Sequence, residues 1–152
     1  MTALPEHLSV DLPHDSGFPI DVRVPTDVRL IEPLVGLVTR QCAVRQLSPR
    51  ACNLRVPVAL TEALSNAMLY GNREDRSLSV RLRARLDEVS LVLEVVDEGT
   101  GFDMEACTID PTGPEHLERE DGRGLFLMRT LMDRVERFTD GGNVVRLTLH
   151  RA

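Results

Sequence analysis

The arrangement of apolar and polar residues along the chain predicts both strands and helices. The clearest strand is residues 78–86, where apolar residues alternate with one serine and three arginines, so that one side is apolar and the other basic and wet. Residues 78–96 and 134–150 should each form an antiparallel hairpin, the second around a turn that contains Gly141 and Gly142. The strands predicted in full are residues 18–24, 78–86, 91–96, 134–139 and 144–150.

Helical periodicity predicts three further segments. Pro33 suits the first turn of the first helix, because that position needs no amide donor. Pro57 fits the second helix less well, so either this helix is kinked or the helix proper begins near Arg55. Gly71 is expected to end it as a left-handed cap. The predicted helices are residues 33–46, 55–71 and 125–132.

Together these elements predict an α+β fold. We expect a two-layer α/β sandwich, with a mixed or mostly antiparallel sheet of about five strands and three helices on one face. The domain should span residues 18–152, after a flexible N-terminal arm at residues 1–17 that is polar and without period. Residues 103–121 have no period and lie between two glycine-containing stretches, which predicts a mobile lid over a ligand.

Two polar residues interrupt the aliphatic second helix. At about 100° per residue, Glu62 and Asn66 lie one turn apart at the edge of the apolar arc. A carboxylate at the rim of a core loses solvation and needs a partner. Glu62 and Asn66 can share one metal–phosphate centre, the asparagine oxygen as metal ligand and the glutamate as base; alternatively they are two border polar residues without further role.

Composition narrows the classes of function. Hydrophobic residues make up 42% of the 152 residues and aromatic residues 3%, so the core must be aliphatic. The formal net charge of −6 disfavours a surface that binds a nucleic-acid backbone, and we expect no direct contact with nucleic acid. The three cysteines have neither disulfide-framework nor zinc-site spacing, and the four histidines have no metal-ligand spacing.

The sequence also predicts a location. Free cysteines are typical of a reducing compartment. The N-terminus lacks the basic-then-apolar layout of a signal peptide, and no apolar run approaches the ~18 residues of a membrane span. We therefore expect a soluble, cytoplasmic protein without membrane contact.

A second candidate site residue is Asp97, at the end of a predicted strand. An ionised aspartate only accepts hydrogen bonds, so it can take the amino proton of adenine, whereas guanine offers an acceptor at that edge. Gly99 and Gly101 follow it and would let the backbone approach a ligand closely. The alternative is a turn-capping aspartate followed by turn glycines.

A third candidate is the pair Gly122 and Gly124, which precede the third predicted helix. The first amide groups of a helix are unpaired donors that point at an anion, and phosphate is the obvious guest. Arg123 either contacts the γ-phosphate or is a solvated lid residue.

These three motifs resemble, in order and spacing, the N, G1 and G2 boxes of the Bergerat-type ATP-binding fold shared by gyrase, Hsp90, MutL and histidine kinases. Within that superfamily, the short chain and the run from Gly122 to Val135 most resemble the anti-sigma regulatory factor serine/threonine kinases. The similarity spans roughly residues 20–150. The quoted motifs are residues 59–72, 97–103 and 121–128.

The resemblance implies roles for the site residues. Asn66 binds Mg²⁺ that bridges the phosphates of ATP, and Glu62 acts as general base toward a serine of a partner protein. Residues of the G1 and G2 boxes bind the nucleotide: Asp97, Gly99, Gly101, Gly122, Arg123, Gly124 and Leu125. Tyr70 departs from the family pattern, because relatives often have histidine before Gly71.

The resemblance also implies partners. The expected function is phosphorylation of a serine on an anti-sigma factor antagonist of the STAS type, alternating with binding of a sigma factor or equivalent target, and a homodimer is possible. Two other readings stay open. One is a nucleotide-gated binding module without phosphotransfer, and the other is a detached ATP-binding domain of a histidine kinase, although no phosphoacceptor histidine on a long dimerising helix is visible.

Overall fold

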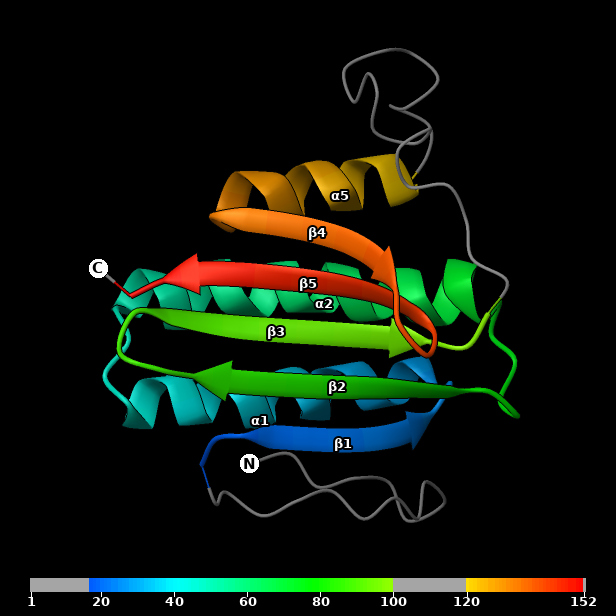
Figure 1. Ribbon diagram of the computed structural model, residues 1–152, viewed down its shortest axis with the longest axis horizontal. Coiled ribbons are helices and arrows are strands. Elements are labelled where there is room, and N and C mark those ends of the chain that lie inside the picture. Colours follow the sequence, from blue (N-terminus) through cyan, green and yellow to red (C-terminus); the bar gives the residue numbers. More distant parts are fainter. Residues whose placement is uncertain (1–16, 100–119, 152) are drawn as a thin grey trace.

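The computed structural model of the protein describes residues 17–99 and 120–151. In this part of the chain, helices cover one face of a five-stranded sheet (Figure 1). The predicted two-layer α+β fold is therefore confirmed. The elements in chain order are β1 (Ile20–Pro25), α1 (Ile31–Val44), α2 (Val56–Asn66), β2 (Ser79–Leu86), β3 (Ser90–Asp97), α5 (Glu120–Leu131), β4 (Arg134–Thr139) and β5 (Asn143–His150).

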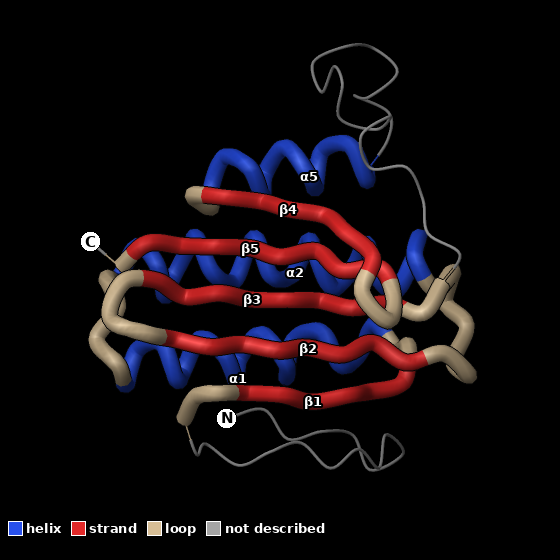
Figure 2. Tube along the Cα trace, in the orientation of Figure 1, coloured by secondary structure: helices blue, strands red, loops and turns tan. Residues whose placement is uncertain are grey.

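The sheet is antiparallel throughout the described residues. Its strand order is β1-β2-β3-β5-β4, so both predicted hairpins, β2–β3 and β4–β5, are present and pair with one another through β3 and β5. Figure 2 shows α1 and α2 behind the sheet and α5 beside β4. The β3–β5 pairing places the two hairpins in one register, with Asp97 opposite Asn143. Of the two predicted sheet types, the antiparallel one is correct.

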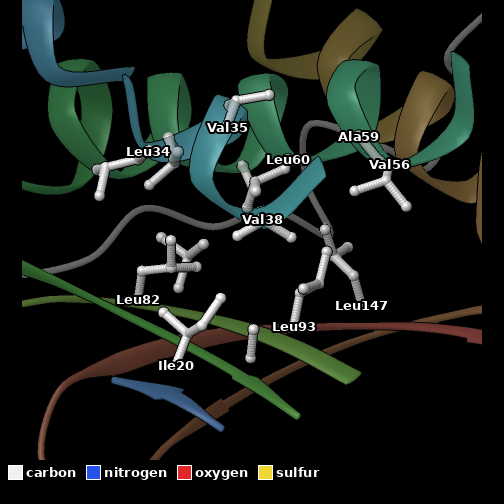
Figure 3. Close-up of a cluster of buried hydrophobic side chains, with 14 of the residues drawn as sticks. Ile20, Leu34, Val35, Val38, Val56, Ala59, Leu60, Leu82, Leu93 and Leu147 are labelled. Atoms are coloured by element: carbon white, nitrogen blue, oxygen red, sulfur yellow. The ribbon is translucent and has the colours of Figure 1, made fainter. Parts of the chain in front are cut away.

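The core lies between the sheet and the helices and is aliphatic, as the composition predicts. Alternate residues of the strands face the helices, and Leu82, Leu93 and Leu147 are nearly inaccessible to solvent. Figure 3 shows them opposite Val38 of α1 and Leu60 of α2. Burying each large aliphatic side chain contributes about 1.5–3 kcal/mol, which makes this layer the main source of stability.

The start of α2 resolves the question raised by Pro57. A wide π-helical turn, η3 (Ala51–Arg55), precedes the helix, and α2 begins at Val56, so Pro57 lies in its first turn. Proline is tolerated in the first turn of a helix, and the wide turn before it still holds Val56, whose amide donates to the Ala51 carbonyl. The second predicted alternative, a helix proper that begins near Arg55, is confirmed.

The end of this helix differs from the prediction. A second π-helical turn, η4 (Ala67–Gly71), follows α2, and the helical segment does end at Gly71. However, the residues with positive φ are Arg73 and Glu74, at 51° and 58°, and not Gly71. The predicted left-handed cap at Gly71 is therefore wrong. The structure requires glycine there because Asp97 lies against its Cα.

Helix α5 is longer than predicted at its N-terminal end. It begins at Glu120 and not after Gly124, so Gly122 and Gly124 lie inside the helix. A glycine in a helix costs about 1 kcal/mol relative to alanine. Burial of Leu125 and Met128 in the core offsets that cost. This burial cannot be predicted from local helix propensity alone.

The open face of the sheet is rich in paired charges. Arg81 pairs with Asp21 at 2.6 Å, and Glu94 accepts contacts from Arg83 at 3.3 Å and from Arg146 at 2.8 Å. The predicted basic face of β2 is therefore real, but acidic residues of the neighbouring strands neutralise much of it.

Another aspartate joins two loops. Asp27 follows β1 and caps the short 3₁₀ turn η2 (Val28–Leu30). Its carboxylate accepts hydrogen bonds from Arg29 at 2.7 Å and from Arg76 at 2.8 Å. The hydrogen bond from Arg29, with smaller help from the charges of both arginines, lowers the pKa of Asp27 from its ordinary value to about 2.

Several predictions lie outside the described residues. These are the N-terminal arm, apart from Gly17, the lid at residues 103–121, apart from its last two residues, and the site residue Gly101. Within the described ranges, no helix has the length and apolar character needed to cross a membrane.

Candidate functional site

Helix α2 places Glu62 and Asn66 on one side, at the end of the core that faces α5. Glu62 is half-buried and Asn66 is 4% exposed, so the predicted position at the rim of the core is confirmed. Ala59 and Ala63 pack on the core side of the same helix. The sequence could predict the shared side from helical spacing, but not that Asn66 is almost fully buried.

Gly124 of α5 meets these two side chains. A Cβ added to Gly124 would lie 2.7 Å from Oε2 of Glu62, 3.4 Å from Nδ2 of Asn66 and 3.6 Å from its Oδ1. A real side chain there would therefore displace Glu62 or Asn66. The fold thus brings together residues that are about sixty positions apart in the sequence, and only glycine allows the close approach.

The Asn66 amide is incompletely satisfied. Its Nδ2 atom is buried and has no hydrogen-bond partner among the residues that the structure describes. Leaving a buried donor unpaired costs about 1–3 kcal/mol, which a fold tolerates where the group has a use. The two ends of an asparagine amide can exchange by rotation, so the same position can donate to a phosphate or present its oxygen to a metal ion.

These residues fit a magnesium–phosphate group better than a metal site built from protein alone. The described residues contain no group of three or more His, Cys, Asp or Glu side chains that could hold a metal. Mg²⁺ usually needs only one or two protein ligands and takes the others from phosphates and water. A single amide oxygen at Asn66 meets that requirement.

Asp97 ends β3 at the opposite end of the candidate site. It is 5% exposed, and its Oδ1 atom accepts hydrogen bonds from Nδ2 of Asn143 at 2.8 Å and from the amide of Gly99 at 3.0 Å. Burial raises the pKa of Asp97 above its ordinary value, although both hydrogen bonds act to lower it.

Gly71 and Gly99 bring the helix layer into contact with the end of β3. A Cβ on Gly71 would overlap the Asp97 carboxylate, and its nearest atom would be Oδ2. A Cβ on Gly99 would overlap the backbone carbonyl of Gly71. The predicted close backbone approach at Gly99 is therefore present, although the neighbour is Gly71. Both glycines are needed for space, and neither has a positive φ.

The two parts of the site lie along one helical segment. Glu62, Asn66 and Gly71 follow one another on α2 and η4, and nine residues of helix span about 14 Å at 1.5 Å per residue. Asp97 lies at the Gly71 end and Gly124 at the Glu62 end. The candidate site is therefore elongated, with the Asp97 carboxylate at one end, Glu62 and Gly124 at the other, and the Asn66 amide between them.

The other predicted residues of the G2 box take different positions. Gly122 is the third residue of α5, Arg123 is exposed, and Leu125 is 2% exposed within the core. The structure therefore brings Gly124 to Glu62 and Asn66. It places Leu125 in the packing between α5 and the rest of the helix layer.

Sequence reasoning missed Asn72. Its side chain is 1% exposed, and Nδ2 donates to the Thr26 hydroxyl at 2.8 Å and to the Ser79 carbonyl at 3.0 Å. Its Oδ1 accepts from the amide of Glu98 at 2.9 Å. One amide therefore links the end of the helical segment to the residue after β1, to β2 and to the residue after Asp97. The adjacent Gly71 was the only sequence signal for a special position here.

Asn143 was also missed, because the sequence predicts it only as part of a turn. In the structure it is the first residue of β5, and the β3–β5 register sets it opposite Asp97. Its amide donates to Asp97 and to the Gly99 carbonyl, the latter at 2.9 Å. Only knowledge of how the two hairpins pair could have revealed this contact.

The fold has known relatives among ATPase domains. Residues 24–149 match the model of the histidine kinase-like ATPase domain, and the chain belongs to this family. Among curated proteins, it is 36% identical over 96 residues to the serine-protein kinase RsbW of Bacillus subtilis and 35% identical over 96 residues to that of Bacillus licheniformis. Each of these alignments covers 60% of this chain and 60% of the relative, so the chain spans about 60% of the length of the RsbW proteins that it matches.

An anti-sigma factor is similar over more of its length. The anti-sigma F factor of Clostridium beijerinckii is 32% identical over 113 residues, which cover 71% of this chain and 77% of that protein. The resemblance to anti-sigma regulatory kinases, predicted from the three motifs, is thereby confirmed.

Proposed function

We propose that this protein is an ATP- and Mg²⁺-dependent protein serine/threonine kinase of the anti-sigma regulatory type. The observation that carries the proposal is the convergence of Gly124 on Glu62 and on the buried, unpaired amide of Asn66. A carboxylate, an amide and a helix backbone with no side chain between them fit the phosphate end of a bound nucleotide.

The other end of the site fits the base. Oδ2 of Asp97 faces Gly71, and an ionised carboxylate accepts the 6-amino proton of adenine. Gly71 and Gly99 keep side chains out of this corner, and Gly101 follows two positions later in the sequence. The elongated site then runs from the adenine end at Asp97 to the γ-phosphate end at Glu62.

At the phosphate end, Asn66 would hold Mg²⁺ through its amide oxygen. A bound ion there would supply positive charge to neutralise the phosphates. The N-terminal end of α5 supplies amide donors for the phosphates, and Gly122 lies among its first residues. Arg123, which is exposed in the same turn, is in the right part of the chain to contact the γ-phosphate.

Glu62 is the proposed general base. It accepts the proton of the attacking serine hydroxyl, whose oxygen bonds to the γ-phosphorus as the bond to the bridging β,γ-oxygen breaks and ADP leaves. Little other chemistry is required of the protein, because phosphoryl transfer depends mainly on position and charge.

The proposed partners are an antagonist protein of the STAS type, which supplies the serine, and a sigma factor. The names of the relatives, serine-protein kinase and anti-sigma F factor, support these two classes. An open groove of about 460 Å³ between α1 and α2, with Thr61 and Ser65 in its wall, offers room for a partner segment. A homodimer and the absence of direct nucleic-acid contact remain predictions.

A transfer assay tests this function. Partners captured in the presence of MgATP are incubated with the protein and γ-labelled ATP, and the acid stability of the label is measured. We expect an acid-stable phosphoserine, and we expect Glu62→Gln to retain MgATP binding but lose at least 100-fold in transfer rate. Glu88→Gln, an exposed glutamate in the β2–β3 turn, is the matched control and should transfer normally.

The outcomes separate the three readings. Wild-type protein that binds MgATP but labels no captured partner is the nucleotide-gated binding module. An acid-labile phosphohistidine on a partner or on the protein identifies a histidine-kinase domain. Full activity of Glu62→Gln would remove Glu62 from the role of base.

A further inference from the structure

The amide of Asn143 has only one possible orientation. Its two neighbours, Oδ1 of Asp97 and the carbonyl of Gly99, are both acceptors, at 2.8 and 2.9 Å. An amide oxygen there would repel both of them, so the nitrogen must face them, and both of its hydrogens are used. The backbone supports this position, because Gly142 has a φ of 151° and leaves only 2.6 Å between an added Cβ and the Asp97 carbonyl.

This amide makes the two oxygens of Asp97 unequal. Oδ1 accepts two N–H groups, from Asn143 and from Gly99, so both of its lone pairs are occupied. Oδ2 is the atom nearest to the Cα side of Gly71, and no donor from the described residues is bonded to it. The carboxylate is therefore held in one orientation, and Oδ2 is its one acceptor that no donor of residues 17–99 or 120–151 occupies.

We propose that Asn143 is a specificity-determining residue that makes the site select a purine with an amino group at position 6. It does so by occupying Oδ1 of Asp97 and fixing the Gly99 carbonyl, which leaves Oδ2 as the acceptor for that amino group. Asn143 acts through Asp97 and is therefore a positioning residue. The inference rests on the proposed function, because it assumes that ATP occupies the site.

The proposal predicts how the site treats two nucleotides that differ in one group. ATP has an amino group at position 6, and inosine triphosphate has a carbonyl oxygen there. Neither the ionised Oδ2 nor the inosine carbonyl oxygen has a proton to donate, so the two repel each other. The adenine amino group does donate, and Oδ2 accepts its hydrogen bond. Without Asn143, the carboxylate is free to rotate and to move with the Gly99 turn, and this selection weakens.

The test is a comparison of binding constants. MgATP and MgITP are titrated by calorimetry into the full-length chain, its Asn143→Ala variant and its Asn143→Ser variant. The ATP-to-ITP affinity ratio of the wild type should be at least tenfold. In Asn143→Ala it should fall about tenfold through weaker ATP binding alone, and in Asn143→Ser, which keeps one donor, the ratio should be intermediate.

A stability control separates positioning from loosening. Arg146→Met lies on the same strand and loses its contacts with Glu94 and Glu136, on the face of the sheet away from Asp97. It should lower the unfolding midpoint but leave the ATP-to-ITP ratio unchanged. Circular dichroism confirms that each variant is folded, and Asn143→Ser serves if Asn143→Ala is not.

Three results would overturn the inference. They are an unchanged ratio in a folded Asn143 variant, equal losses of affinity for both nucleotides, and a wild type that binds MgITP as well as MgATP. A wild type that binds neither nucleotide is a different failure, since it removes the proposed function itself.

Discussion

Two aspartates in this protein have nearly the same small solvent exposure and yet have pKa values shifted in opposite directions. Asp27 is 7% exposed and Asp97 is 5% exposed. Asp27 is bonded to the guanidinium groups of Arg29 and Arg76, and its pKa is lowered to about 2. Among the described residues, Asp97 is bonded only to neutral N–H donors, from Asn143 and from Gly99, and burial raises its pKa.

The difference in bonding partners distinguishes Asp27, which stabilises the fold, from Asp97, which belongs to the candidate site. A buried carboxylate with charged partners has its desolvation cost offset within the protein. The surroundings of Asp97 leave part of that cost uncompensated, and one of its oxygens is unbonded within the described residues. Burial alone therefore does not identify a functional aspartate. The charge of the bonding partners distinguishes the two, because an aspartate of a binding site keeps an acceptor atom unbonded for its ligand.

Asn72 connects the two regions, and its loss should have the largest effect. Its side chain bonds Thr26, the neighbour of Asp27, and the amide of Glu98, the neighbour of Asp97. Asn72→Leu leaves the Ser79 carbonyl and the Glu98 amide without these partners, while the Thr26 hydroxyl keeps its bond to the Leu78 carbonyl. The free energy of unfolding should therefore fall by about 4 kcal/mol in urea titrations.

The matched control for this change is Asn53→Leu, an exposed asparagine in η3. It should change the free energy of unfolding by less than about 0.5 kcal/mol. Equal effects of the two substitutions would mean that the Asn72 amide does not hold the two regions together.

Exchange of each aspartate for asparagine tests the comparison directly. Asp97→Asn should weaken MgATP binding about 100-fold, because Oδ2 is replaced or reoriented, and should leave the free energy of unfolding at pH 7 equal or higher. Asp27→Asn should do the reverse, with a loss of about 2 kcal/mol in stability and MgATP affinity within twofold. Urea unfolding and calorimetry measure both properties, and each variant is the control for the other.

The two aspartates also mark where sequence reasoning succeeds and where it stops. The strand that ends at Asp97, the two hairpins and the shared helix face of Glu62 and Asn66 follow from local periodicity. The partners of Asp97 do not, because Asn143 reaches it only through the β3–β5 register. Register between separate hairpins depends on tertiary packing, which no local pattern reports.

Two errors have the same origin. The prediction gave Gly71 a left-handed backbone, since glycine commonly ends helices that way, but its purpose is space for Asp97. The prediction also began the last helix after Gly124, since glycine is a weak helix former, but packing on α2 extends the helix through both glycines. In each case a contact distant in sequence overrides the local preference.

At the phosphate end of the site, substitution of Asn66 should have a smaller effect on stability than substitution of Asn72 or Asp27, and in the opposite direction. Nδ2 of Asn66 is buried and unpaired, so replacing it by an apolar side chain of similar volume removes a desolvation cost. Asn66→Leu should raise the free energy of unfolding by about 1 kcal/mol and abolish Mg²⁺-dependent ATP binding. Loss of stability in Asn66→Leu, judged against Asn53→Leu, would mean that the amide is satisfied within the folded chain.

The pH dependence of stability tests the opposite pKa shifts of Asp27 and Asp97 directly. The native pKa of Asp27, about 2, lies below its unfolded value of about 3.9, so its contribution is present above pH 4 and is lost as the pH falls toward 2. The native pKa of Asp97 lies above its unfolded value, so its contribution is present below about pH 3.9 and is lost as the pH rises through the native pKa. Urea unfolding of the wild type and both asparagine variants between pH 3 and 7 measures the two contributions as differences.

The stabilisation of the wild type over Asp27→Asn should grow from pH 3 to about pH 5 and then stay constant. The disadvantage of the wild type against Asp97→Asn should be absent at pH 3 and appear as the pH rises. If the stability difference between wild type and variant changed with pH in the same way for Asp27→Asn and Asp97→Asn, the bonding partners of these aspartates would not determine their pKa values.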